Sequence, residues 1–570
     1  MGGVPYRPMT GSTETAPRSG VNVSPPGGVA RFRTAILPAS RPALGLFAVS
    51  LAAILVLAGL RVADETGPAI GIVQAVFLVA TVALAAIDLR LAVGLAILEL
   101  VCGGAGGQWT QFPGGASGRV VLVAIVTIAG AGRIVGSWRR TGRLDLGRYG
   151  PHALGLAIVM TGAWMALGLL NHNNPRDVFA DGNGQLFLAF ALPLGVLIRD
   201  GDGAWLRRWL LVACAANALL TGFFILVSVT NIVPAWPTLN NILLTHLAYG
   251  GNVGYIPNVA FILALGSGLY LQVGLALVTW ELLVAPRRTW PWALAALLVV
   301  DVIATYSRGF WAGTVIAIGI VLVLGAPSVA RVGVVVGGLC GMLLVGTLVL
   351  GAFGHSLPAY LLHRSESILV AGPPPSPSLP PASVPPAGAS SAPTPAPPPL
   401  IEGPTVVETA GAISNAYRAV QAEVLVGHIR QRPVFGHGWG TIAADYPYGS
   451  IFSYELAYLD LLYKTGFVGA ALFLSFPLRL LVDAGRGRFR RRRLPDGLGP
   501  REAAIPIAIL VAVLVTGATN PYILATLGLL PILACIAWLD PGRVTTPAGV
   551  GGDDGASAAR VTQDRVPPGG

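Results

Sequence analysis

The residues best suited to chemistry lie in the second half of the chain, close to long apolar segments. Arg308 stands in the sequence Tyr-Ser-Arg-Gly between two apolar runs, and Arg418 precedes the run Pro-x-x-Gly-x-Gly-x-Gly that begins at Pro433. Glu455 follows at the start of the next apolar run. A guanidinium fork holds phosphate oxygens through paired, charge-assisted hydrogen bonds, and a carboxylate accepts protons. These residue types predict a site at a membrane surface for an anionic, lipid-borne substrate.

Each of these charged residues also has a structural interpretation. An arginine at a helix end commonly extends to lipid headgroups, and Arg418 taken alone fits a solvated residue of a surface helix. A carboxylate such as Glu455 in a first helical turn is favoured by the helix dipole. Arg308, however, lies in a tight turn on the face with few arginines, and a charge at membrane depth is a functional candidate. We therefore predict catalytic roles for Arg308, Arg418 and Glu455, with the two arginines as a clamp on substrate.

The run Gly436–Gly440 predicts a sharp turn. Its backbone N–H groups can approach an anion, although Gly-x-Gly-x-Gly is common in the loops of glycine-rich proteins. On this basis Gly436 and Gly438 are predicted substrate-binding residues. His437 and Tyr458 are predicted to lie at the same site, while a partly exposed loop histidine is the simpler interpretation of His437.

Metal or cofactor chemistry has little support in the sequence. Adjacent Asp64 and Glu65 in the first predicted external loop have the chemistry to bind a divalent cation, but a polar turn is the simpler interpretation. The four cysteines lie in or at the ends of apolar segments, without the spacing of a metal site or a disulfide framework. We expect neither a metal nor a cofactor.

The composition is that of a polytopic membrane protein. Of the 570 residues, 54% are hydrophobic and only 11% are charged, and the mean hydropathy is +0.69. A net charge of +11 is compatible with nucleic-acid binding, but the basic residues cluster in short loops between apolar runs, where they orient membrane proteins. The predicted fold class is therefore all-α, a polytopic transmembrane helical bundle with no nucleic-acid partner.

A run of about 20 apolar residues crosses the hydrocarbon core of a bilayer. This criterion gives about 12–14 spans, near residues 43–61, 69–88, 118–138, 152–170, 185–199, 207–232, 259–284, 291–306, 309–326, 329–352, 455–482, 504–518 and 522–539, with a weaker candidate at 90–102. If the N-terminus is cytoplasmic and all fourteen runs cross, every strongly basic loop falls on the cytoplasmic side. The same count places residues 353–454 outside.

The predicted organisation has five parts. They are a disordered cytoplasmic N-terminus (1–40), transmembrane helices (41–352), a large extracytoplasmic loop (353–454), further transmembrane helices (455–540) and a disordered cytoplasmic tail (541–570). Within the loop, residues 372–400 are mostly Pro, Ser and Ala and are expected to be disordered. Residues 408–431 have apolar side chains at helical spacing and predict a short helix that Pro433 ends.

The order of these motifs resembles the O-antigen ligase and polymerase family of bacterial envelope proteins, over roughly residues 305–470. The family has Ser-Arg-Gly at a span boundary, matched by Ser307-Arg308-Gly309, and an arginine about fifteen residues before Pro-x-x-Gly-x-Gly, matched by Arg418. Its His-Asn-x-Tyr-Leu and Gly-x-x-Gly elements follow in the next helix. This chain has Tyr458-Leu459 and Gly466-x-x-Gly469 there.

One departure concerns the family's histidine, which is thought to help activate the acceptor hydroxyl. This chain has Glu455 at that position and Leu456 in place of the asparagine. A carboxylate also accepts protons. The departure is therefore compatible with a polymerase that has a different base, and also with an inactive or repurposed member.

The resemblance implies a metal-independent glycosyltransferase of cell envelope biogenesis in the bacterial cytoplasmic (inner) membrane, with an extracytoplasmic active face. The implied reaction transfers saccharide from a polyprenyl diphosphate-linked glycan to a sugar hydroxyl of an acceptor glycan or glycolipid. Envelope proteins that regulate chain length are further expected partners.

Two alternatives remain open. One is a type-C glycosyltransferase that uses a polyprenyl monophosphate sugar, with Asp64 and Glu65 as base and metal site. The other is a transporter of lipid-linked glycan, although the chain shows no matching halves of the kind that transporters usually have.

Overall fold

The computed structural model describes residues 40–62, 68–103, 117–230, 252–256, 260–264, 267–305, 307–352, 405–446, 454–489 and 500–540. The predicted disordered N-terminus and tail, the Pro-rich residues 372–400 and the acidic pair Asp64 and Glu65 lie outside these ranges. The helices from Arg41 onward belong to one compact unit.

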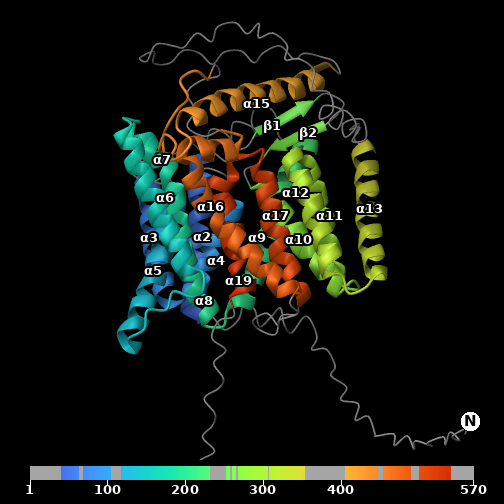
Figure 1. The fold of residues 1–570 in the computed structure, drawn as a ribbon. Helices are drawn as coiled ribbons and strands as arrows, with labels where there is room; N and C mark the ends of the chain where they lie inside the picture. Colours follow the sequence, from blue (N-terminus) through green and yellow to red (C-terminus); the bar gives the residue numbers. More distant parts are fainter. Residues whose placement is uncertain are drawn as a thin grey trace, which may run out of the picture. The chain divides into compact units, whose positions relative to one another are not determined.

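Helices make up nearly all of the described structure (Figure 1). Within the described ranges, ten helical segments are long and apolar enough to cross a membrane, and three shorter apolar helices accompany them. The elements are α2 (Arg41–Val62), α3 (Pro68–Ile87), α4 (Leu89–Cys102), α5 (Gly118–Thr141), α6 (Gly150–Leu170), α7 (Pro175–Leu186), η2 (Phe187–Phe190), α8 (Ala191–Arg199), α9 (Gly203–Thr230), β1 (Asn252–Ile256), β2 (Ala260–Ala264), α10 (Gly268–Val284), α11 (Thr289–Ala304), α12 (Arg308–Ile320), η5 (Val321–Gly325), α13 (Val329–Ala352), α15 (Thr405–Gln431), α16 (Ala457–Phe489), η7 (Pro500–Ala503), α17 (Ala504–Gly517), η8 (Pro521–Leu524), α18 (Thr526–Ala534) and α19 (Ile536–Leu539). The protein is a polytopic, multi-pass helical membrane protein.

The observed helices follow the predicted spans closely and confirm the fold class. The predicted span 259–284 is wrong in its first part, because Ala260–Ala264 forms β2, paired antiparallel with β1, and α10 begins only at Gly268. A short apolar run satisfies a strand as well as a helix, so its pattern alone does not distinguish them. The predicted helix in the late loop is confirmed as α15.

One end of the bundle carries the strongly basic connections, and we call it the basic face. Arginines there bind the ends of neighbouring helices: Arg148 pairs with Asp483 at 2.9 Å, and Arg207 donates to the carbonyl of Ala537 at 2.7 Å. The α15 helix crosses the other end, and β1 and β2 lie at the same end of the bundle (Figure 1). We call that end the α15 face.

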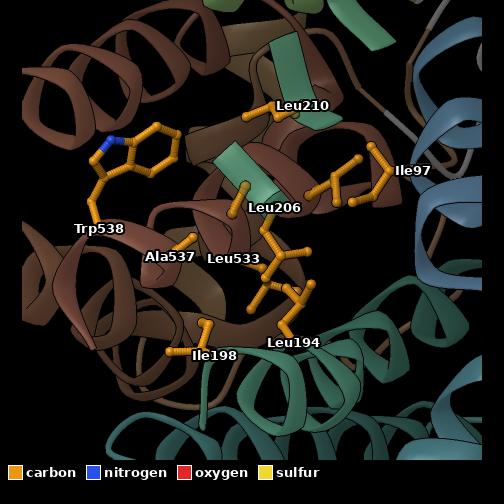
Figure 2. A pocket seen from close by; sticks show the side chains of 10 residues that line it. Ile97, Leu194, Ile198, Leu206, Leu210, Leu533, Ala537 and Trp538 are labelled. Atoms are coloured by element: carbon orange, nitrogen blue, oxygen red, sulfur yellow. The ribbon is translucent and has the colours of Figure 1, made fainter. Parts of the chain in front are cut away.

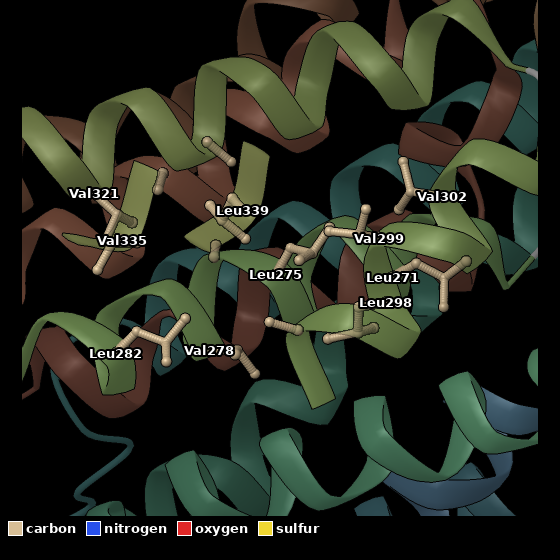
Figure 3. Close-up of a cluster of buried hydrophobic side chains, with 14 of the residues drawn as sticks. Leu271, Leu275, Val278, Leu282, Leu298, Val299, Val302, Val321, Val335 and Leu339 are labelled. Atoms are coloured by element: carbon tan, nitrogen blue, oxygen red, sulfur yellow. The ribbon is translucent and has the colours of Figure 1, made fainter. Parts of the chain in front are cut away.

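A core of buried apolar side chains joins α10, α11, α12, α13 and α17 (Figure 3). At its edge α12 approaches α17 closely through Gly309 and Gly313, one helical turn apart, where a side chain would overlap Thr519 just after α17 or Thr516 within it. Small residues at this spacing let two membrane helices come into close contact. This contact fixes the start of α12, which is Arg308.

A small pocket lies among α4, α8, α9 and the last two helices (Figure 2). Its lining is apolar and includes Ile198, Leu206 and Trp538, which lie close to the helix ends of the basic face. No lining residue carries a charge that would balance an anion. The pocket is therefore a packing space, and the candidate site lies on the α15 face.

Candidate functional site

The α15 helix is held on the bundle by one apolar face. Leu425 and Ile429 of this face pack against Tyr446, Tyr454 and Tyr463, and together they form a buried cluster. The helix ends at Gln431, just before Pro433, because proline cannot continue the hydrogen-bond ladder. The packing fixes both the height and the rotation of α15, and so it sets where the polar residues of the same face lie.

Arg418 and Glu455 form an ion pair, with 2.8 Å between Nε and Oε2. Their side chains are 27% and 58% exposed, so the pair is open to solutes. Gln421, one turn along α15, is 2% exposed and accepts a hydrogen bond from the backbone N–H of Leu456 at 3.0 Å. Glu455 precedes α16, which begins at Ala457. Gln421 thus holds the backbone next to Glu455 and keeps the carboxylate beside Arg418.

Arg308 is the first residue of α12 and is partly buried on the α15 face. Phe310, in the same first turn of α12, stacks on Tyr522 of η8, with ring centroids 5.7 Å apart. The carboxylate of Glu455 lies within electrostatic range of the same tyrosine. These contacts connect the start of α12 with η8, and the predicted clamp of Arg308 with Arg418 remains a prediction. The first N–H groups of a helix and its dipole favour a bound anion at this position.

The predicted turn is confirmed, since Gly436, Gly438 and Gly440 all have positive φ angles. Each also touches backbone: a side chain at Gly438 would overlap Gly168 of α6, and one at Gly440 would overlap Val178 of α7. These glycines therefore allow the turn to lie directly on two helices.

The N–H groups of the turn all donate within the protein. Gly436 donates to Arg432 O, His437 to Tyr463 O, Gly438 to Lys464 O and Trp439 to Trp164 O, while Gly440 donates to the Asp181 carboxylate. Backbone groups already bonded in this way do not cradle an anion. The structure therefore gives Gly436 and Gly438 a role in packing, and their predicted contact with substrate remains a prediction.

The second glycine motif completes the same arrangement. Gly466 has a φ of +63° and interrupts α16. The interruption frees carbonyl groups that accept hydrogen bonds from the turn, and the N–H groups of Phe467 and Val468 donate to the carbonyls of Pro433 and Val434. Irregular backbone at membrane depth requires such partners within the protein. The two glycine motifs are separated in the sequence, but hydrogen bonds between their backbones join them into one structural unit.

This unit reaches well below the end of the bundle. The indole of Trp439 donates to the carbonyl of Met160, which lies ten residues before the last residue of α6, Leu170. Ten residues span about 15 Å along a helix. The turn is therefore an inserted element that anchors the loop carrying Glu455.

His437 and Tyr458 both make structural contacts. The ring of His437 donates from Nδ1 to the carbonyl of Tyr463 at 3.1 Å, and its pKa is lowered mainly by burial. The hydroxyl of Tyr458 donates to the carbonyl of Leu514 in α17 at 2.6 Å. Tyr458 thus directs its polar group into the bundle, and the predicted binding role of both residues remains a prediction.

The lowered pKa of His437 predicts a pH dependence of stability. Because the folded state disfavours the imidazolium, its contribution is present above the ordinary pKa of 6.5 and is lost as the pH falls below it. We expect the melting temperature in detergent to fall between pH 7.5 and 5.5, and to fall less in His437→Gln. Asp445, whose pKa is lowered by its bond to His428, contributes a separate loss only in more acidic solution. Equal slopes in both proteins would contradict this assignment.

Two polar groups close to the candidate site were not predicted from the sequence. One is Gln421, whose signal is its place one helical turn after Arg418. The other is a buried ion-pair cluster of Lys464 with Asp181 and Asp460, at distances of 2.9 and 3.0 Å. Its signal is the only lysine of the chain, placed in an apolar helix four residues after an aspartate.

A comparison with protein families agrees with this geometry. Residues 293–474 match the model of a family described as O-antigen ligase, and this range contains Arg308, Arg418, Glu455 and both glycine motifs. No curated protein sequence matches the chain. The segment in which Gly309 approaches α17, Arg418 pairs with Glu455 and hydrogen bonds join the two glycine motifs is thus the part of the chain that matches the O-antigen ligase family.

Proposed function

We propose that the protein is a glycan polymerase or ligase that transfers saccharide from a polyprenyl diphosphate donor to an acceptor sugar hydroxyl. The Arg418–Glu455 pair, half exposed on the α15 face, is the observation that carries the proposal. It combines an anion-binding group with a potential base within one contact distance. The family match supports a ligase- or polymerase-type membrane function.

In the proposed reaction Arg308 and Arg418 hold the diphosphate. Glu455 takes the proton of the acceptor hydroxyl as its oxygen forms a bond to the anomeric carbon of the donor sugar. The bond between that carbon and the phosphate oxygen breaks, and its electron pair leaves with the polyprenyl diphosphate. Fixed positive charge where negative charge develops is commonly the largest contribution to such catalysis.

The ion pair also has a role in the order of events. A half-exposed pair contributes only about 0–1 kcal/mol, so a diphosphate, with its greater charge, displaces the Glu455 carboxylate from Arg418. A carboxylate released from a guanidinium has its oxygens free to accept the proton of an acceptor hydroxyl. Donor binding would thereby activate Glu455, and acceptor deprotonation would follow donor binding.

The distribution of charge supports a sidedness for this reaction. Arginine-rich connections favour the cytoplasmic side, so the basic face is assigned to the cytoplasm and the α15 face to the outer side of a bacterial inner membrane. The lipid-linked donor would then meet the site at the outer leaflet. An acceptor glycan or glycolipid and chain-length regulators would meet it there as well.

The glycan profile of a deletion strain tests the proposal. We expect loss of long chains, with single lipid-linked repeat units accumulating for a polymerase and unattached long chains accumulating for a ligase. Complementation with Asp64→Asn together with Glu65→Gln is expected to restore the profile. An unchanged profile in the deletion strain would refute the proposal, and failure of this double variant would favour the type-C mechanism.

A further inference from the structure

The only lysine of the chain is completely buried. Lys464 is 0% exposed, and its ammonium lies 2.9 Å from a carboxylate oxygen of Asp181 in α7 and 3.0 Å from one of Asp460 in α16. The ring of Trp439 lies 6.0 Å from the same ammonium. Buried charges are costly even when paired, and charges within membrane helices are usually functional. This cluster therefore requires an explanation beyond packing.

The two carboxylates hold the chain on both sides of the segment that leads to Glu455. Asp181 accepts a hydrogen bond from the N–H of Gly440 at 2.9 Å, where the glycine turn ends. Asp460 accepts one from the N–H of Tyr454 at 3.5 Å, immediately before Glu455. The Lys464 ammonium thus connects α7 with α16. Through the two carboxylates it also connects Gly440 and Tyr454, the residues on either side of 441–453.

We infer that Lys464 is a positioning residue for the proposed glycan transfer: with its two carboxylates it fixes the backbone that holds Glu455 opposite Arg418. Because Lys464 is buried, it acts through this backbone and not through contact with substrate. The inference rests on the proposed function for the reaction. The anchoring itself is a property of the fold and is measurable without activity.

The test removes all three charges together, as Lys464→Met with Asp181→Asn and Asp460→Asn. Lys464→Met alone would leave two carboxylates buried without their partner, whereas neutral groups of similar size commonly replace a buried ion pair without loss of stability. In the full-length triple variant we expect amide exchange in peptides 436–446 and 454–460 to rise about tenfold, with α10 and α11 unchanged.

The activity arm measures chain growth with a polyprenyl diphosphate donor. We expect kcat to fall about 100-fold, the typical effect of a displacement of about 1 Å at a catalytic group, while KM for the donor stays the same. The matched control is Arg119→Met with Glu99→Gln, which removes another buried pair, 3.0 Å apart, between α4 and α5. This control is expected to change neither the exchange of the two peptides nor kcat.

The outcomes separate the inference from the proposed function. Unchanged exchange, or faster exchange with normal kcat, overturns the positioning role. Faster exchange in a protein whose wild type transfers no saccharide refutes the proposed function and supports the anchoring. If the triple variant fails to accumulate, Asp460→Asn alone is expected to raise exchange in peptide 454–460 and not in 436–446, and equal exchange in both overturns the inference.

Discussion

Arg418→Ala is expected to reduce chain growth by about 10²–10³-fold, and Arg308→Ala by a similar factor, while both proteins still accumulate in the membrane. The reason is that each variant removes a fixed positive charge from the position where the diphosphate gains charge in the transition state, an effect of about 3–4 kcal/mol in comparable sites. Neither side chain belongs to the buried core, so the fold is retained. The measurement is glycan length in a deletion strain complemented with each variant.

The matched control is Arg430→Ala, which removes an exposed arginine from the last turn of α15, the helix that carries Arg418. It is expected to leave glycan length unchanged. Lysine at position 308 or 418 should restore little activity, because a single ammonium does not reproduce the paired hydrogen bonds of a guanidinium. Normal glycan length in both alanine variants would exclude the arginine clamp.

Much of the fold could be predicted because membrane helices are specified by local composition. The apolar runs and the arginine-rich connections fix the helices and the basic face, and neither depends on contacts between distant residues. The helix that ends before Pro433 is likewise a local signal. The strand Ala260–Ala264 was missed because its apolar run fits both kinds of element.

The candidate site could be predicted only in part, because its geometry depends on contacts across long stretches of chain. The types and order of Arg418 and Glu455 predict a functional role for both residues. Their ion pair joins positions 37 residues apart, and only the folded structure shows it. The glycine turn illustrates this point. In the sequence its N–H groups are candidates for binding an anion, whereas in the fold they donate hydrogen bonds to groups that include acceptors on α6, α7 and α16. Hydrogen-bond partners of a turn are a tertiary property.

The same reasoning applies to Lys464. A lone lysine in an apolar helix signals an unusual environment, and the aspartate four residues earlier predicts one partner. Asp181 comes from a helix nearly 300 positions away, and Gly440 adds its N–H to the same carboxylate. The cluster therefore links a helix that precedes the matched residues 293–474 to the glycine turn within them.

Gly438→Ala is expected to prevent stable folding. The new methyl group would overlap the backbone of Gly168 at a φ of +86°, which disfavours any side chain. Strain of the backbone and overpacking together cost on the order of 2–5 kcal/mol, a large share of the total stability of a domain. The measurement is the amount of protein in the membrane and its melting temperature in detergent.

Gly427→Ala is the matched control for this prediction, since it adds the same methyl group nearby. Gly427 lies within α15, is exposed, and has nothing within 4 Å of the added carbon. Alanine should raise stability there by about 0.5–1 kcal/mol, because it favours the helix. If Gly438→Ala and Gly427→Ala accumulated and melted alike, the glycine turn would not be inserted against α6, and the anchoring of the loop that carries Glu455 would need a different explanation.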